Sequence, residues 1–169
     1  MVCRRAQKCV RLALLLVGYL SVWLLFGVMV HGVDSVLHAL VAAQPWLASH
    51  AGVIGASTLL VAGVYQFTPL KAYCLSQCRS PRSFIVARWR GQRPGAEAFR
   101  LGVEHGLFCL GCCWSLMLLM FGVGVGSLAW MLGLGVLMAM EENLRWARRL
   151  TRPVGLGLIA WACLELAGF

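Results

Sequence analysis

Charged side chains are scarce in this sequence. Asp, Glu, Lys and Arg make up 12% of its 169 residues, and only six residues are acidic, whereas soluble domains are about 25% charged. Hydrophobic residues account for 60% of the chain, which is more apolar surface than a fold of this length can bury away from water. The composition therefore excludes a soluble enzyme, a disordered tail and a collagen-like chain, and it indicates an integral membrane protein.

Cysteine is too sparse for a disulfide-stapled domain. The chain has eight cysteines, which is below the density of roughly 8–10% at which small secreted domains rely on disulfide bonds. Such domains are also far less apolar than this chain. The cysteines therefore require another explanation.

Stretches free of charged residues predict where the chain crosses the membrane, because each charge costs about 2.5–3.5 kcal/mol at a helix centre. A crossing needs roughly 20 residues. We expect an all-α, polytopic bundle of about five helices that forms a single integral membrane domain over residues 1–169. The predicted spans are residues 12–31, 51–72, 105–123, 126–141 and 153–169, of which the last is marginal in length. Residues 33–50, with Pro45 and Trp46, predict a helix lying at the outer interface.

The basic residues fall into three groups, at positions 4–11, 71–100 and 145–152. With these spans all three groups lie on one side, which the positive-inside rule identifies as cytoplasmic. The N-terminus and the loop at residues 72–104 are therefore predicted inside. The first apolar run exceeds the roughly 7–15 residues of a signal peptide, so we expect it to remain as an anchor. We predict a multi-pass protein of the bacterial cytoplasmic (inner) membrane, with lipid phosphates rather than nucleic acid facing its basic loop.

Cysteine and histidine side chains recur at helical spacing near the predicted cytoplasmic end of two neighbouring spans. One helix face, about 100° wide, carries His105, Cys109, Cys112 and Cys113. The preceding span ends with Cys74 and Cys78, one helical turn apart. Neighbouring antiparallel helices would bring these six side chains, Cys74, Cys78, His105, Cys109, Cys112 and Cys113, to one end of the bundle. The sequence thus predicts a metal site there.

Two chemical arguments support a metal. Cytoplasmic thiols are kept reduced, so a permanent disulfide is not expected, and a bound cation offsets the cost of thiolates in an apolar site. Soft sulfur ligands favour copper(I), zinc or an iron–sulfur centre, and Met120 on the same face favours copper, with zinc as the alternative. In the competing interpretation the cysteines are small hydrophobic residues that pack the helices. In a straight second span Cys74 and Cys109 differ in height by about 10 Å, a gap that a bend at Pro69 would close.

Other polar residues give further expectations. His31, Asp34 and His38 share one face of a continuing helix at the outer surface, which predicts a second metal or proton site, or else an incidental Asp–His hydrogen bond. Glu104 is expected to form an ion pair with Arg100, four residues earlier. The remaining inner-side carboxylates, at positions 141 and 142, are expected to be solvated or paired with a nearby arginine at position 145.

Several motifs together resemble a known family. They are Tyr65-Gln66-Phe67-Thr68-Pro69-Leu70-Lys71, Cys74, Cys78-Arg79-Ser80-Pro81, Gly91 and His105-Gly106-x-x-Cys109-Leu110-Gly111-Cys112-Cys113-Trp114. In order and spacing this pattern is similar to the predicted metal-binding integral membrane proteins of the domain of unknown function 2182 family, over about residues 65–142. The resemblance implies metal binding through these cysteines and histidines. The turn at residues 124–127 departs from the family pattern.

The function expected from these features is a non-enzymatic membrane protein that binds a soft metal ion, copper before zinc, for transfer or insertion. Its partners would be the lipid bilayer, a metal donor or acceptor protein and other membrane subunits. The alternative is a small structural or assembly subunit of a larger membrane complex. An enzyme is not expected: a thiol oxidoreductase would place its reactive pair outside, and Ser57 and His105 lie at opposite membrane sides, roughly 15 Å or more apart.

Overall fold

The computed structural model describes residues 2–122, 128–144 and 148–167, and every regular element in these ranges is a helix. The first, α1 (Val2–Ala43), has 42 residues and at 1.5 Å per residue is about 63 Å long. It ends at Ala43 because Gln44 precedes a proline and helical backbone is disfavoured at that position, and the short α2 (Pro45–Ser49) follows. The predicted interfacial helix at 33–50 is therefore wrong. Most of that stretch is the end of α1, since it holds no glycine or proline between Val33 and Ala43.

The predicted span at 51–72 is two helices, α3 (Ala51–Tyr65) and α4 (Pro69–Cys78), bent by 68° at the break between them. Thr68 caps α4, where its side chain accepts a hydrogen bond from the Lys71 backbone N–H at 3.3 Å. Pro69 occupies the first turn of α4, where its missing N–H is not needed. A bend is thus present at Pro69, the residue that the sequence offers for it.

The remaining helices are α5 (Pro81–Arg88), α6 (Pro94–Gly122), α7 (Leu128–Asn143) and α8 (Arg148–Ala167). The loop predicted at 72–104 is largely helical, because it contains the end of α4, all of α5 and the first turns of α6. The helix predicted from residue 105 accordingly begins at Pro94, eleven residues earlier. The glycine-containing turn at 124–127 lies outside the described residues.

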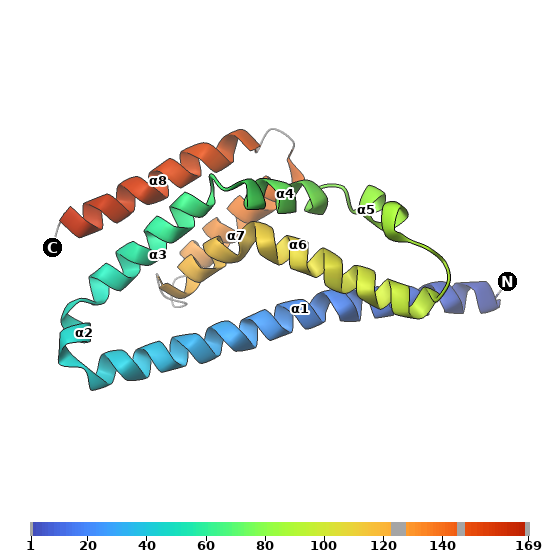
Figure 1. Ribbon diagram of the computed structural model, residues 1–169, viewed down its shortest axis with the longest axis horizontal. Coiled ribbons are helices and arrows are strands. Elements are labelled where there is room, and N and C mark those ends of the chain that lie inside the picture. The colour runs from blue at the N-terminus through green and yellow to red at the C-terminus, as the bar shows by residue number, and fades with distance from the viewer. Residues whose placement is uncertain (1, 123–127, 145–147, 168–169) are drawn as a thin grey trace.

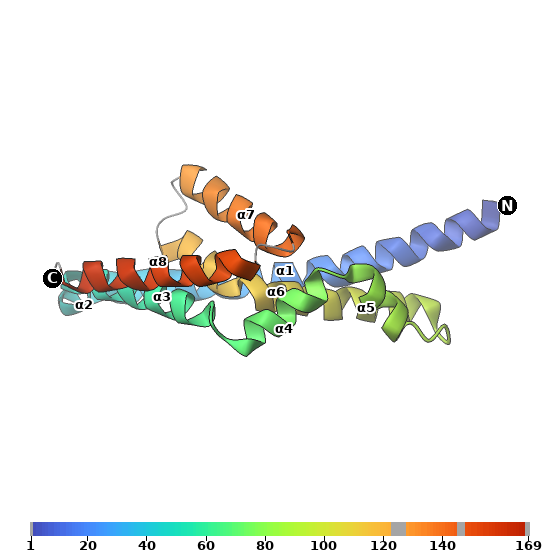
Figure 2. The ribbon, with the colours of Figure 1, turned by 90° about the horizontal axis from the view of Figure 1, so that it is seen from above.

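The helices pack in pairs, α1 along α6 and α3 along α8, while α4 lies on α6 (Figure 1). Seen from above, α7 stands on one side of the layer that the other long helices form (Figure 2). Glycines set the closest approaches. A Cβ atom on Gly102 would overlap the carbonyl of Leu15, and one on Gly18 would overlap that of Phe99. Small residues therefore let the backbones of α1 and α6 touch, as is typical of membrane helices.

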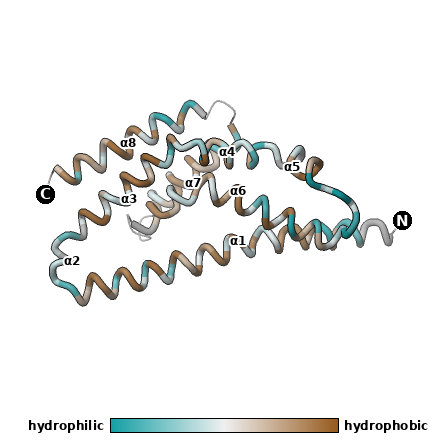
Figure 3. The backbone as a smooth tube through the Cα atoms, in the orientation of Figure 1, coloured by the Kyte–Doolittle hydropathy of each residue, from teal (hydrophilic) through white to brown (hydrophobic). Residues whose placement is uncertain are grey.

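Three helical segments are long and apolar enough to cross a membrane: Ala6–Ala43, Pro94–Met120 and Arg149–Ala167. The bent pair Gly52–Tyr65 and Pro69–Cys78 adds a fourth if it counts as one span. The span predicted at 126–141 corresponds to α7, whose 16 residues reach only about 24 Å. Apolar residues follow α1 and α3, and hydrophilic residues gather where α5 leads into α6 (Figure 3).

Candidate metal site

One face of α6 carries four of the predicted ligands. His105, Cys109, Cys112 and Cys113 follow one another at helical spacing within α6. The His105 Nε2 atom lies 3.7 Å from the Cys109 Sγ atom. The thiols of Cys112 and Cys113 each donate to the Cys109 carbonyl at 3.0 Å. These contacts confirm that the four residues share one face of the helix.

The bent α4 brings its cysteines against this face. The Cys78 Sγ atom lies 3.3 Å from that of Cys109 and 3.9 Å from that of Cys112. Cys74 is buried in the same cluster as Cys112 and Cys113, and its sulfur sits against Gly111, where a Cβ atom would come within 2.7 Å of it. The 68° bend thus lets thiols from two helices meet.

A carboxylate from α7 completes the cluster. The Glu142 Oε1 atom accepts a hydrogen bond from the Cys112 thiol at 3.4 Å. Ligand atoms of Cys112, Cys113 and Glu142 all lie within 4.8 Å of one another, and in the described part of the chain no other three metal-ligating side chains gather so closely. Sequence reasoning missed Glu142 because it expected a solvated residue. Its signal was a carboxylate at the end of a span in a chain with six acidic residues.

The cluster is sheltered on one side and open on the other. Cys112 and Cys113 are 1% and 3% exposed, whereas Cys78 is half-buried. A pocket of about 400 Å³ reaches Cys78, Cys109, His105 and Glu142 from outside, and Leu15, Leu16, Tyr19, Arg79 and Asn143 also line it. Burial, together with the negative charge of nearby cysteine sulfurs, raises the pKa of the Glu142 carboxyl to about 8.

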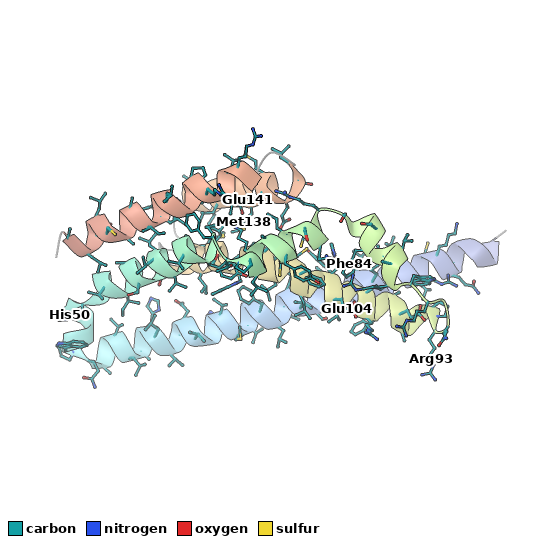
Figure 4. The ribbon with its side chains drawn as sticks, turned by 45° about the horizontal axis from the view of Figure 1, so that its top comes forward. His50, Phe84, Arg93, Glu104, Met138 and Glu141 are labelled. Atoms are coloured by element: carbon teal, nitrogen blue, oxygen red, sulfur yellow. The ribbon has the colours of Figure 1, made fainter. Side chains whose placement is uncertain are left out.

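Two methionines other than the predicted one pack against the thiols. Met120 was expected beside them but packs against the separate core that contains Leu59 and Leu116, because it lies two helical turns, about 10 Å, beyond Cys113. Met117 and Met138 contact the cysteine cluster instead. Figure 4 shows Met138 and Glu141 close together near the middle of the molecule. Thioethers therefore border the site, although they come from other positions.

A buried ion pair lies next to the cluster. The Lys71 ammonium is 2.7 Å from a carboxylate oxygen of Glu141, and the two side chains are 1% and 3% exposed. Lys71 also donates to Gln66, and Arg79 donates to the Glu141 backbone carbonyl. The expectation of a solvated carboxylate is wrong for Glu141, which is buried and paired with Lys71, while Glu142 contacts Cys112. The arginine at position 145, the other expected partner, lies outside the described residues.

The predicted outer site is less assembled. His38 Nδ1 lies 3.4 Å from a carboxylate oxygen of Asp34 and 2.9 Å from its backbone carbonyl. These residues and His31 lie on the continuous α1, as expected, but within the described residues they form no group of three close ligand atoms. The His38 side chain is 78% exposed. This arrangement matches the incidental Asp–His contact more closely than a metal site.

The expected ion pair between Arg100 and Glu104 forms at 2.7 Å. Cys9 and Cys163, for which no role was predicted, are exposed.

Comparison with known proteins gives one match. A family model described as PpoB2, copper chaperone, matches residues 1–164. No curated protein and no solved structure matches the chain.

Proposed function

We propose that this chain, which belongs to the PpoB2 copper chaperone family, holds copper(I) as cargo among its thiols and passes it to another protein. The match over residues 1–164 supports the metal binding that the resemblance implies, with copper as the metal. Assignment to the domain of unknown function 2182 family stays a prediction.

The observation that carries the proposal is the convergence of donor atoms from three helices. Thiols from α4 and α6, an imidazole from α6 and a carboxylate from α7 meet with successive separations of 3.3–3.9 Å. Packing alone accounts for buried cysteines, but it does not account for a histidine nitrogen and a carboxylate directed at them. The set is rich in sulfur, which favours copper(I), and zinc is the alternative ion because an imidazole and a carboxylate are also present.

The role we propose is binding and transfer without catalysis. Copper stays in one oxidation state, and the protein supplies ligands and shelter from water. The partner is a protein that donates or accepts copper(I).

A membrane location is part of the proposal. It is supported by the three long apolar helices and the bent pair, and by large apolar side chains on α1 such as Leu24 and Leu25, which are 71% and 72% exposed. Such a flank requires lipid or partner helices to cover it. The basic ends of the helices support an inner-membrane orientation with the cluster near the cytoplasmic side.

The same exposed flank of α1 favours a second candidate, a structural or assembly subunit of a larger membrane complex. In that case the complex would form at fixed stoichiometry, and changing cysteines to serine would leave it intact. Both functions can belong to one protein.

The test is copper content after loading. Protein purified in detergent under anaerobic conditions is loaded with copper(I), freed of excess metal and analysed for copper per chain. We expect about one copper per wild-type chain, and loss of most of it in the Cys112→Ser/Cys113→Ser double variant. Cys163→Ser, an exposed cysteine away from the cluster, is the matched control. Folded wild-type protein without copper, or a double variant that loads normally, would refute the proposal.

A further inference from the structure

We infer that the cluster works as two stations in series, an interpretation that rests on the proposed function. The outer station consists of His105, Cys109 and Cys78, and the inner station of Cys112, Cys113 and Glu142. Copper(I) is received at the outer station and stored at the inner one.

The donor atoms of the two stations form a continuous row. From His105 to Cys109 the gap is 3.7 Å, and from Cys109 to Cys78 it is 3.3 Å. The row continues from Cys78 to Cys112 over 3.9 Å, and from Cys112 to Glu142 over 3.4 Å. At every point the next ligand is already beside the one in use, so a copper ion can move along the row without losing coordination.

Access differs between the two stations. The pocket of about 400 Å³ is lined by all three outer-station residues, and of the inner-station residues only Glu142 lines it. Cys112 and Cys113 are almost fully buried. An ion arriving from outside therefore meets Cys78 and Cys109 before it can reach Cys112 or Cys113.

His105 directs one ring nitrogen, Nε2, at the start of the row. Its Nε2 faces Cys109, while its buried Nδ1 has no hydrogen-bond partner among the described residues. Metal-binding histidines ordinarily use one ring nitrogen for the ion and the other for an orienting hydrogen bond. Here Nε2 is the nitrogen that faces the ligand row, and the rings of Phe84 and Tyr19, with centroids 5.5 and 6.1 Å away, flank the imidazole in place of such a hydrogen bond.

The thiols of Cys78 and Cys109 line the pocket together with the side chains of Arg79 and Glu142. In the relay the partner presents copper(I) on thiolates, which the thiols of Cys78 and Cys109 replace. In each step a bond from copper to the incoming sulfur forms as the bond to the departing sulfur breaks. The proton of the incoming thiol passes to the departing thiolate, and copper remains in the +1 state.

The experiment separates rate from affinity. Detergent-purified full-length protein is mixed anaerobically with copper(I) bound to a coloured water-soluble chelator, and loading is followed by loss of colour. Equilibrium competition with the same chelator gives the affinity. The variants are Cys78→Ser, Cys113→Ser and, as the matched control, Cys163→Ser. Cys78→Met keeps a soft sulfur ligand at the outer station.

The two-station arrangement predicts that Cys78→Ser changes mainly the rate of copper loading and Cys113→Ser mainly the affinity. Cys78→Ser slows both loading and release by about tenfold or more, a barrier increase of about 1.4 kcal/mol, and it lowers the affinity less than Cys113→Ser does. Cys78→Met recovers much of the rate. Cys113→Ser loads at the wild-type rate but binds copper about 10–100-fold more weakly. A single site is indicated, and the relay overturned, if both serine variants lose affinity equally while loading rates stay the same.

Other outcomes are also decisive. Wild-type protein that takes up no copper overturns the proposed function together with the relay, whereas wild-type uptake with equal variant effects overturns the relay alone. If Cys78→Ser fails to fold by circular dichroism and gel filtration, the comparison of Cys78→Met with Cys113→Ser decides. A Cys78→Met variant that binds copper more tightly than Cys113→Ser while loading no faster supports the relay, and equal affinities for the two variants refute it.

Discussion

Lys71 and Glu141 carry opposite charges in a place where water does not reach them. Removing two charges from water is costly, and only close pairing with further hydrogen bonds offsets that cost. Here Gln66 accepts from Lys71, and Arg79 holds the backbone carbonyl of Glu141. The pair therefore fixes α7 against α4 beside the thiols. It positions Glu142, the next residue along α7, toward Cys112.

Breaking this pair on one side leaves an uncompensated buried charge. We expect Lys71→Met to lower the free energy of unfolding in detergent by about 3–5 kcal/mol, and the double variant Lys71→Met/Glu141→Leu to be more stable than Lys71→Met alone. Arg100→Gln removes the exposed partner of Glu104 and is the control, with a loss of about 0–1 kcal/mol. A double variant less stable than Lys71→Met would contradict this account.

Glu142 distinguishes the two candidate ions. A carboxylate oxygen is a hard ligand that suits zinc better than copper(I), while the thiols serve both. Glu142→Gln should therefore weaken zinc binding by about tenfold or more and change copper(I) affinity less. Competition titrations with each metal measure the two effects. Equal losses for both ions would mean that Glu142 acts on the fold and not as a ligand.

At the level of single elements, α6 was the most predictable part of the site. The spacing of His105, Cys109, Cys112 and Cys113 along one helix fixes their common face, because helical geometry depends only on the sequence between them. A bend at Pro69 was considered because it would close the difference in height between Cys74 and Cys109. The position of Glu142 depends on how α7 returns after residue 127, which is decided by tertiary packing, so the sequence offered no geometric reason to place it at the thiols.

The approach of α1 to α6 depends on glycine at defined points. Gly102→Ala would force its Cβ atom into the carbonyl of Leu15, so we expect the helices to separate and the free energy of unfolding to fall by about 1–3 kcal/mol. For Gly133, on α7, no atom of the described residues outside its own stretch of helix backbone lies within 4 Å of an added Cβ. The control Gly133→Ala should be neutral or stabilising by about 0.5–1 kcal/mol. Comparable losses in both variants would show that helix contact is not the cause.

For the whole molecule, composition predicted the all-helical fold and the long apolar helices. A chain with so much apolar surface is expected to lie in lipid, where a helix satisfies its own backbone hydrogen bonds. Composition was less informative about the ends of elements. The predicted break after residue 31 is absent since nothing before Gln44 interrupts helical backbone, and α7 is too short to meet the length expected of a crossing.

Orientation in the membrane remains a prediction that epitope tags can test in the full-length protein. A tag inserted after Gln44 should be reached by antibody in intact spheroplasts. A tag after Gln92, in the basic connection before α6, should be reached only after permeabilisation, because basic segments stay inside. Unmodified protein supplies the background. Both tags on one side of the membrane would exclude the proposed topology.

The most direct test of the account is the identity of the atoms bound to copper. X-ray absorption at the copper edge of the anaerobically loaded wild-type protein should show copper(I) surrounded mainly by sulfur. The Cys112→Ser/Cys113→Ser variant should show a loss of sulfur neighbours. Copper bound chiefly through nitrogen and oxygen in the wild-type protein, or an unchanged sulfur shell in the variant, would contradict a copper site built by these thiols.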